Sequence, residues 1–353
     1  MDINYFAPIN PLSYGVVSAN ILLALHKLGH RVSLFTIGGV QCQTQEIASV
    51  AKECLNNAKQ FNCYAPCVKI FHQNQLAERI GKGKYYGLPI FELDKFSDIE
   101  VCHLNSTDRL IAPSKWAEGV FHSNGLKPSL TDVVPFGVDT SIFRPIEIPQ
   151  VTDTYQFFNI GKWEKRKGHD ILPRLFSKAF TSKDDVRLVM ATHNNFLSPD
   201  EVKKWHTIYE GCDLSSKIDI NVGGFSSQSN INDLINNCDC GIFPSRAEGW
   251  NLPLMESMAV GKPVITTNFS AHTEFCTPEN SFLVDIEETE KAFDGKWFFG
   301  QGEWASLDFD QEEQIIEHMR HCYRERPSNP TGIETAKRFS WENTAKRLLG
   351  VIG

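Results

Sequence analysis

The sequence predicts an α/β protein with two doubly wound halves, each a parallel sheet covered by helices. Three observations predict this class. Short apolar runs alternate with amphipathic segments, which is typical of βαβ units. The chain has 353 residues, more than one ordinary core accommodates, so two domains are expected. A proline-bearing stretch with little periodicity separates two series of elements near residue 148.

In the first half, a strand over Ile3–Ala7 leads through Gly15 into a helix that stops at Gly29. A second strand, Arg31–Thr36, completes one Rossmann-type unit. This unit lacks the full G-x-G-x-x-G fingerprint, so Gly15 fits a tight turn and close approach to a ligand equally well. The further expected elements are a strand over 110–113, a helix over 115–123 and a strand over 131–135.

The second half continues the alternation. The expected strands are 156–161, 186–191, 218–222, 240–243 and 263–267, and the expected helices are 169–180, 199–209, 230–238, 252–260 and several over 311–350. Two such halves leave a cleft between them, and ligands lie beyond the carboxyl ends of the strands. The chemistry is therefore expected on the loops that follow strands.

The composition is that of a soluble globular protein, with 41% hydrophobic and 22% charged residues. Disordered and coiled-coil chains are excluded by this mixture. The sequence shows no apolar run long enough to span a membrane and no secretory signal. The spacing of the ten cysteines does not resemble that of a zinc site, so we expect free thiols. We expect a cytoplasmic protein without a metal. Peripheral contact with a membrane stays open, and for a viral source the compartment is the host cytoplasm.

The net charge of −8 is unevenly distributed. Residues 1–148 hold 13 Lys+Arg and 13 Asp+Glu, so the whole excess of acid lies in the second half. General affinity for nucleic acid is disfavoured by this balance, although a local basic patch on the neutral half stays open.

One informative loop is 161–168, GKWEKRKG, which follows the first strand of the second half. It carries four cations within six residues, close to a predicted helix start. Backbone N–H groups and ammonium charges in this setting suit a diphosphate. A solvated charged turn is the competing interpretation.

A second informative loop is 244–256, PSRAEGWNLPLME. Asn251 and Pro253 favour a helix start there, which leaves N–H groups available to an anion. Glu248 precedes the helix and Glu256 lies in its second turn, so both can face one ligand. A carboxylate accepts two hydroxyl hydrogen bonds and so suits a ribose diol or a sugar. Alternatively, Glu248 only complements the helix dipole and Glu256 is solvated.

Both loops resemble those of family 4 glycosyltransferases. Glu248 and Glu256 form E-x7-E within PSRAEGWNLPLMESMAVGKPVI, and IGKWEKRKGHDIL is similar to the family's G-R-x-x-x-x-K-G loop. DRLIAPSKWAEGVFHSNG with VVPFGVDTSIFRP resembles the segment that ends its first domain. The resemblance covers at least residues 105–275 and extends weakly to RFSWENTAKRLL.

The resemblance implies the GT-B fold, two Rossmann-like domains facing a central cleft. The implied domains are 1–148 on the acceptor side and 149–340 for the nucleotide-sugar, with a helix over about 341–353 packing back on the first. It also implies a retaining enzyme that uses a UDP- or GDP-sugar as donor and requires neither cofactor nor metal.

The resemblance further assigns roles to residues of the two loops. Lys162 and Lys167 would bind the donor diphosphate, and Glu256 and Glu248 would hold the ribose diol and the donor sugar. Lys162 stands where the family usually has Arg. A single ammonium group therefore replaces a guanidinium that can donate two parallel hydrogen bonds. Backbone N–H groups of Gly249, Trp250, Asn251 and Leu252 would complete the phosphate cradle, and Gly15 would approach the diphosphate from the first domain. Arg246 is a further donor-side candidate.

A first-domain candidate comes from the segment PIFELDKFSD. Many relatives place a His on the loop that faces the donor sugar, and this segment resembles a subset with Glu there. Glu92 is then the first-domain active-site candidate, and an ordinary surface carboxylate is the alternative. No carboxylate is assigned as a covalent nucleophile. The family therefore implies front-face displacement, in which the leaving phosphate accepts the acceptor's proton.

The acceptor-side candidates lie mainly in 77–87, AERIGKGKYYG, where three cations stand beside two tyrosines. Such a segment can contact phosphate and stack a base or a sugar ring, or it can face an anionic lipid headgroup. A solvated glycine-rich loop is the third possibility. The candidates are Arg79, Lys82, Lys84, Tyr85, Tyr86 and, outside the segment, His103.

The leading prediction is a glycosyltransferase that acts on a glycan, lipid-linked or glycoside hydroxyl, as in surface polysaccharide or glycolipid synthesis. A variant glycosylates hydroxylated, for example hydroxymethyl, bases of viral DNA, which the acidic total charge disfavours. A sugar-nucleotide epimerase of the same fold needs no acceptor and is the alternative from another class. A non-catalytic binder is disfavoured by the Glu248/Glu256 and Lys162/Lys167 pairs.

Overall fold

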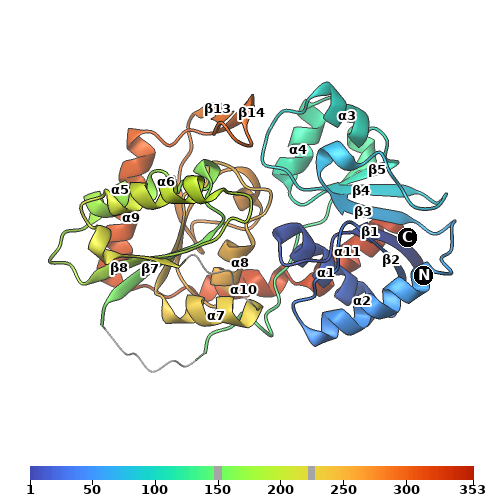
Figure 1. The fold of residues 1–353 in the computed structure, drawn as a ribbon, viewed down its shortest axis with the longest axis horizontal. Coiled ribbons are helices and arrows are strands. Elements are labelled where there is room, and N and C mark those ends of the chain that lie inside the picture. The colour runs from blue at the N-terminus through green and yellow to red at the C-terminus, as the bar shows by residue number, and fades with distance from the viewer. Residues whose placement is uncertain (147–152, 222–226) are drawn as a thin grey trace. The chain divides into compact units, whose positions relative to one another are not determined.

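The computed structural model describes residues 1–146, 153–221 and 227–353. The expected boundary near 148 and Val222, the last residue of one predicted strand, lie outside the described residues. The chain divides into two compact units: unit 1 is Met1–Asp139 with Arg338–Gly353, and unit 2 is Thr140–Lys337. Each unit contains a six-stranded parallel sheet (Figure 1). The predicted α/β class with two doubly wound halves is confirmed.

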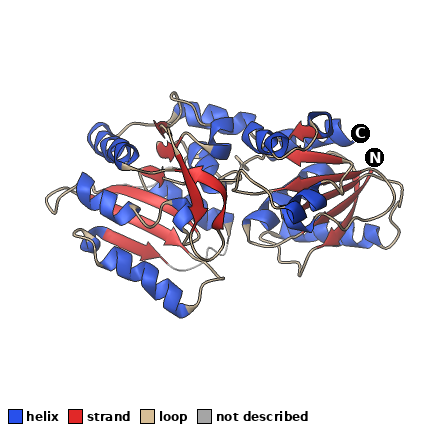
Figure 2. Ribbon diagram, turned by 90° about the horizontal axis from the view of Figure 1, so that it is seen from above, coloured by secondary structure: helices blue, strands red, loops and turns tan. Residues whose placement is uncertain are grey.

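Unit 1 has the strand order β2-β1-β3-β4-β5-β6, with helices on both faces of its sheet (Figure 2). Its elements are β1 (Asp2–Ala7), α1 (Ser13–Lys27), β2 (Arg31–Thr36), α2 (Gln45–Ala58), β3 (Cys67–Phe71), β4 (Tyr85–Pro89), α3 (Asp98–Leu104), β5 (Arg109–Ala112), α4 (Lys115–Ser123), β6 (Thr131–Val133) and α11 (Trp341–Ile352). α3 begins with a capping box, in which Ser97 and Glu100 exchange hydrogen bonds with each other's backbone.

The last helix, α11, is part of unit 1 although it follows all of unit 2 in sequence. The Thr344 hydroxyl donates to the carbonyl of Pro135 at 2.8 Å, and the Trp341 ring lies 6.3 Å from that of Phe136. The N–H of Val138 donates to the carbonyl of Phe339 at 2.9 Å. The chain therefore returns to the first unit, where its two ends lie side by side (Figures 1 and 2).

Unit 2 has the strand order β12-β11-β10-β7-β8-β9, followed by a separate two-stranded hairpin, β13-β14. Its elements are β7 (Tyr155–Gly161), α5 (Leu172–Ala179), β8 (Val186–Thr192), α6 (Pro199–Glu210), β9 (Ile218–Asn221), α7 (Gln228–Asn237), β10 (Cys240–Phe243), α8 (Leu252–Ala259), β11 (Val264–Thr267), β12 (Phe282–Val284), β13 (Thr289–Phe293), β14 (Phe299–Ala305) and α9 (Phe309–Glu325); α10 (Pro330–Arg338) leads back to unit 1.

The strand order of unit 2 reverses between β7 and β10. The chain winds outward from β7 through β8 to β9, then returns to β10 on the other side of β7 and continues to β12. In open α/β sheets ligands bind beyond the carboxyl ends of the strands at this reversal. The loops that leave β7 and β10 are the two that the sequence singles out.

The sequence prediction does not include α2, β3, α3 or β12. Residues 85–87, the last part of the expected basic loop, begin β4, in which Tyr85 and Tyr86 are buried core residues. The hairpin over 289–305 is absent from the sequence prediction because its glycines and its charged side chains have low strand propensity. No helix in the described ranges is long and apolar enough to cross a membrane.

Candidate active site in unit 2

The loops after β7 and β10 are packed against each other. The first contains a 3₁₀ turn, Lys165–Lys167, which ends at Gly168 with φ of 73°. A Cβ at Gly168 would overlap the carbonyl of Pro244, the first residue of the second loop. The N–H of Arg246 donates to the carbonyl of Arg166 at 2.6 Å. Glycine at 168 therefore permits the close approach that joins the two loops.

Arg166 is the buried cation at the centre of this junction. One guanidinium nitrogen donates to Glu248 Oε2 at 2.9 Å and to the carbonyl of Ala247 at 2.6 Å, and the other donates to Glu164 Oε2 at 2.6 Å. No sequence pattern predicts a role for Arg166, since a run of adjacent cations does not show which side chain turns inward. Its role here is to hold two buried carboxylates in place.

Glu248, the first residue of the predicted E-x7-E pair, is buried, and both of its carboxylate oxygens accept hydrogen bonds. Its Oε1 accepts from Lys167 Nζ at 2.6 Å and from the Ser245 hydroxyl at 3.0 Å. Burial alone would raise the pKa of Glu248, but Arg166 and then Lys167 outweigh it and hold that pKa well below its ordinary value. Glu248 is therefore ionised, and the structure pairs it with the lysine predicted to bind the diphosphate.

Lys162 is the most exposed cation of the cluster, with a side chain 40% accessible. Its Nζ lies 3.3 Å from Glu164 Oε1 and 5.6 Å from the centre of the Phe196 ring. The linked ion pairs contain three cations, Lys162, Arg166 and Lys167, and two carboxylates, Glu164 and Glu248, so the cluster carries a net charge of +1. This charge suits an anionic ligand at the ends of β7 and β10.

The helix that follows the second loop, α8, begins at a strained residue. Asn251 has φ of 80° and makes no side-chain hydrogen bond to the first turn. Its Nδ2 instead donates to His272 Nε2 at 2.9 Å, and His272 Nδ1 donates to the carbonyl of Thr267 at 3.0 Å. Burial lowers the pKa of His272 to about 4, so the ring is neutral. The N–H groups of the first turn are thus left to an external anion.

Glu256, the second residue of the pair, lies on α8 in a different environment. Its side chain is buried, and within the described part of the chain its carboxylate takes part in no hydrogen bond or ion pair. Burial raises the pKa of Glu256 to about 8. The two glutamates therefore differ in charge at neutral pH, because only Glu248 has cations beside it.

Two donor-side candidates, Arg246 and Trp250, have side chains that are engaged within unit 2. Arg246 does not face an open site: its guanidinium forms a bidentate pair with Asp170 at 2.8 and 3.1 Å and a third contact with Glu290 at 3.1 Å. Trp250 is a buried core residue whose ring lies 4.9 Å from that of Phe275. Both residues shape the loop between β10 and α8. Gly249 and Leu252 lie in that loop and at the start of α8.

In unit 1, Gly15 lies in the first turn of α1 and not in a tight turn. A Cβ there would overlap the backbone of Asn10, so close packing against the preceding loop accounts for the glycine. Glu92 is half-buried in the loop after β4.

The acceptor-side candidates are dispersed. The hydroxyl of Tyr85 donates to the carbonyl of Leu76 at 2.6 Å, and the neighbouring Tyr86 is buried, so the prediction that these rings stack on a ligand is wrong. His103 Nδ1 accepts the N–H of Ala77 at 3.1 Å, a structural role. Three exposed cations of this segment are left: Arg79, Lys82 and Lys84.

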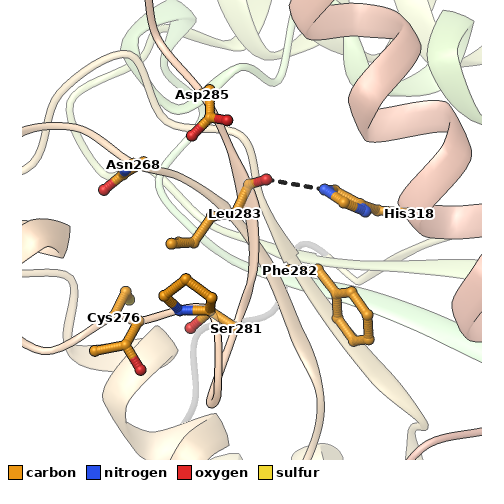
Figure 3. A pocket seen from close by; sticks show the side chains of 9 residues that line it. Asn268, Cys276, Ser281, Phe282, Leu283, Asp285 and His318 are labelled. Carbon is orange, nitrogen blue, oxygen red and sulfur yellow. Dashed lines mark hydrogen bonds between the residues drawn. The ribbon is translucent and has the colours of Figure 1, made fainter.

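A cavity of about 470 Å³ lies elsewhere in unit 2, beside the edge strand β12 (Figure 3). His318 of α9 donates from Nε2 to the carbonyl of Leu283 at its wall, and Asp285 and Asn268 line its other side. It contains none of the predicted site residues. Within the described ranges no group of three or more His, Cys, Asp or Glu side chains could hold a metal ion.

Residues 144–295, which include both packed loops, match the protein family described as "Glycosyl transferases group 1". Unit 2 therefore contains a domain of this family. The chain is accordingly a glycosyltransferase that depends on a nucleotide-sugar donor. The GT-B resemblance predicted from the sequence is confirmed.

Two relatives of this group 1 glycosyltransferase are each 26% identical to it. "Uncharacterized glycosyltransferase 335" of Sulfolobus islandicus rod-shaped virus 1 matches over 275 residues, 72% of this chain and 77% of the relative. "D-inositol 3-phosphate glycosyltransferase" of Segniliparus rotundus matches over 254 residues, 69% of this chain and 51% of the relative.

Solved structures with the same fold include sucrose-phosphate synthase from Thermosynechococcus elongatus, with a TM-score of 0.74, 14% identity and coverage of 99% of this chain and 98% of that one. Anabaena HepE in complex with UDP-glucose has a TM-score of 0.70 and 16% identity, with 99% of both chains covered. At these identities the likeness establishes the GT-B fold.

Proposed function

We propose that this group 1 glycosyltransferase is a retaining enzyme that needs no metal and moves a sugar from a UDP-sugar to a hydroxyl of a glycan, lipid-linked or glycoside acceptor. The observation that carries the proposal is the buried Glu248, held ionised by Arg166 and Lys167 beside the first turn of α8. This arrangement puts fixed positive charge, free N–H groups and one carboxylate at the reversal point of the sheet.

The leaving group in this proposal is a nucleoside diphosphate. Lys162 and Lys167, together with the N–H groups that begin α8, would receive its two phosphates. The cluster has a net charge of +1 before the donor arrives, and this charge attracts the diphosphate. Preorganised cations and dipoles of this kind stabilise a developing anion without reorganising when the bond breaks.

Glu256 would bind the ribose diol. Its carboxyl is neutral below a pH of about 8 in the free protein. Two diol hydroxyls donating to a carboxylate favour the ionised form. Donor binding in this proposal therefore displaces a proton from Glu256, and donor affinity rises as the pH approaches 8.

The proposed reaction is a front-face displacement. The bond between the anomeric carbon and the phosphate oxygen breaks, the acceptor oxygen bonds to the same face of that carbon, and its proton passes to the departing phosphate oxygen. In this proposal the carboxylate of Glu248 would stabilise the positive charge that develops on the sugar. Glu92 of unit 1 stays a predicted active-site residue, and turnover by Glu92→Gln tests it.

A thermal-shift experiment in EDTA tests the donor assignment. UDP-, GDP-, ADP- and TDP-sugars are compared, with the UDP-sugar first because HepE was solved with UDP-glucose. A ligand at 100 times its Kd adds about 2.7 kcal/mol of apparent stability. We expect a selective shift in the wild type and in the exposed-site control Glu210→Gln, and a smaller one in Lys167→Ala. No shift with any donor would refute the proposed site.

Product analysis tests the chemistry. NMR of a product glycoside is expected to show the anomeric configuration of the donor sugar, and an inverted product would contradict the front-face route. Conversion of the donor to its epimer with no acceptor present would instead assign the protein to the epimerase alternative.

A further inference from the structure

The β13-β14 hairpin is attached to both loops of the candidate active site. Lys165 Nζ of the first loop donates to the carbonyl of Phe293 at 3.1 Å. Arg246 of the second loop contacts Glu290 Oε1 at 3.1 Å, and its carbonyl accepts the N–H of Ala305 at 2.9 Å. The hairpin therefore starts and ends on the donor-binding loops, and its position is fixed relative to them.

The tip of the hairpin is also ordered. Asp294 Oδ1 accepts three backbone N–H groups, from residues 296, 297 and 298, at 2.8, 2.8 and 2.9 Å. Lys296 Nζ contacts Glu201 Oε1 at 2.5 Å and donates to the carbonyl of Phe196 at 3.0 Å. The contacts of Lys296 connect the tip of the hairpin to the start of α6. The hydrogen bonds to Asp294 fix the backbone of Trp297 in the turn.

Four large aromatic side chains of this region are exposed to solvent. Phe196 is 49% exposed, Trp297 48%, Phe293 53% and Phe299 68%. The rings of Phe196 and Trp297 meet edge to face at 5.9 Å, and Phe293 pairs with Phe299 across the two strands. Exposed aromatic side chains that are grouped in this way indicate a binding surface. Since Lys162 lies over the Phe196 ring at 5.6 Å, this aromatic surface begins at the donor site.

The charge around the aromatic surface selects its ligand. The hairpin itself, residues 289–305, carries three Asp and Glu against two Lys, and its tip lysine, Lys296, is paired with Glu201. A surface with nearly balanced charge gives little attraction to a polyphosphate chain or an anionic membrane. A neutral sugar ring suits such a surface, because its C–H face packs on an aromatic ring and its hydroxyls donate to carboxylates.

We propose that Phe196, Trp297, Phe293 and Phe299 bind a neutral glycan, the part of the acceptor that extends beyond its reacting hydroxyl. The proposal rests on the proposed function and adds the substrate class: an acceptor of several uncharged sugar units. The hairpin holds this chain at a fixed distance from Lys162, which positions the hydroxyl to be glycosylated.

The probes are three neutral hexasaccharides, maltohexaose, cellohexaose and mannohexaose, with glucose as the short control. Binding is measured by calorimetry and by saturation-transfer NMR on the full chain. We expect the wild type to bind at least one hexasaccharide, glucose to bind far more weakly, and Trp297→Ala and Phe299→Ala each to lose at least tenfold in affinity. Trp297→Phe keeps a ring and should recover most of the loss.

Phe309→Ala is the matched control, because Phe309 is 69% exposed at the start of α9 and lies outside the aromatic surface. Its hexasaccharide affinity should equal that of the wild type. UDP-glucose affinity is measured for every variant and should not change in Trp297→Ala. A wild type that binds hexasaccharide but no nucleotide-sugar would refute the proposed function while leaving the glycan surface intact.

Three results would overturn the inference. One is hexasaccharide binding that Trp297→Ala and Phe299→Ala leave unchanged. Another is a wild type that binds none of the three probes at 10 mM. The third is a preference for neutral phosphatidylcholine vesicles or single-stranded DNA that these two variants abolish, which would assign the surface to a membrane or to nucleic acid.

Discussion

Glu256→Gln isolates the charge of one buried carboxyl without changing its shape. Burial raises the pKa of Glu256 from its ordinary value of 4.5 to about 8. The unfolded chain therefore loses this proton near pH 4.5, whereas the folded protein keeps it until about pH 8. The free energy of unfolding of the wild type falls across that window. At 1.36 kcal/mol for each pH unit, the loss is on the order of 4–5 kcal/mol.

Urea unfolding at pH 5, 6, 7, 8 and 9, followed by tryptophan fluorescence, measures this effect. Glu256→Gln has no proton to lose, so its stability relative to the wild type should rise steadily from pH 5 and level off above pH 8. The exposed-site control Glu210→Gln should follow the wild type at every pH. A constant difference between Glu256→Gln and the wild type would refute the assignment. Saturating UDP-sugar should reduce the difference, because ribose hydroxyls stabilise the ionised carboxylate.

Substitutions at four residues test the remaining parts of the site. Lys167→Ala should weaken nucleotide-sugar binding by about 1.5–3 kcal/mol in calorimetry, and an unchanged affinity would exclude contact with the diphosphate. Glu248→Gln should lower kcat more than donor affinity; a loss of donor affinity with kcat unchanged would place its role in ground-state binding. Arg166→Ala leaves two buried carboxylates short of a cation and should cost about 3–5 kcal/mol in urea unfolding, whereas a loss below 1 kcal/mol would contradict its central position. Asn251→Gly tolerates the positive φ and Asn251→Ala does not, so Ala should be the less stable by about 1 kcal/mol; equal melting temperatures would show that φ is not the constraint.

The elements predicted best from the sequence are those in which local pattern and tertiary packing agree. β2, α4 and β10 have the predicted bounds, because apolar spacing and caps such as Ser114 specify their ends. Both loops of the candidate site were also located from the sequence. A strand followed by a glycine-bearing turn and a helix defines the carboxyl edge of a parallel sheet.

The contacts inside the site could not be predicted in the same way. In a run of three adjacent cations, nothing local distinguishes the buried Arg166 from its neighbours, and its inward orientation depends on Glu248, 82 residues away. Arg246 was predicted to bind the donor because no pattern shows that Asp170 and Glu290 engage it. Tyr85 and Tyr86 follow a basic glycine-rich stretch, and only pairing with β3 and β5 makes them core residues.

The position of α11 affects the order in which the protein folds during synthesis. Unit 2 is continuous in sequence and is complete once residue 337 has been made, whereas unit 1 needs Arg338–Gly353 to cover the region around Pro135 and Phe136. The unit that is translated first is therefore finished last. A released chain that ends before Trp341 leaves this surface exposed to chaperones, proteases and neighbouring chains, even though it contains all of unit 2.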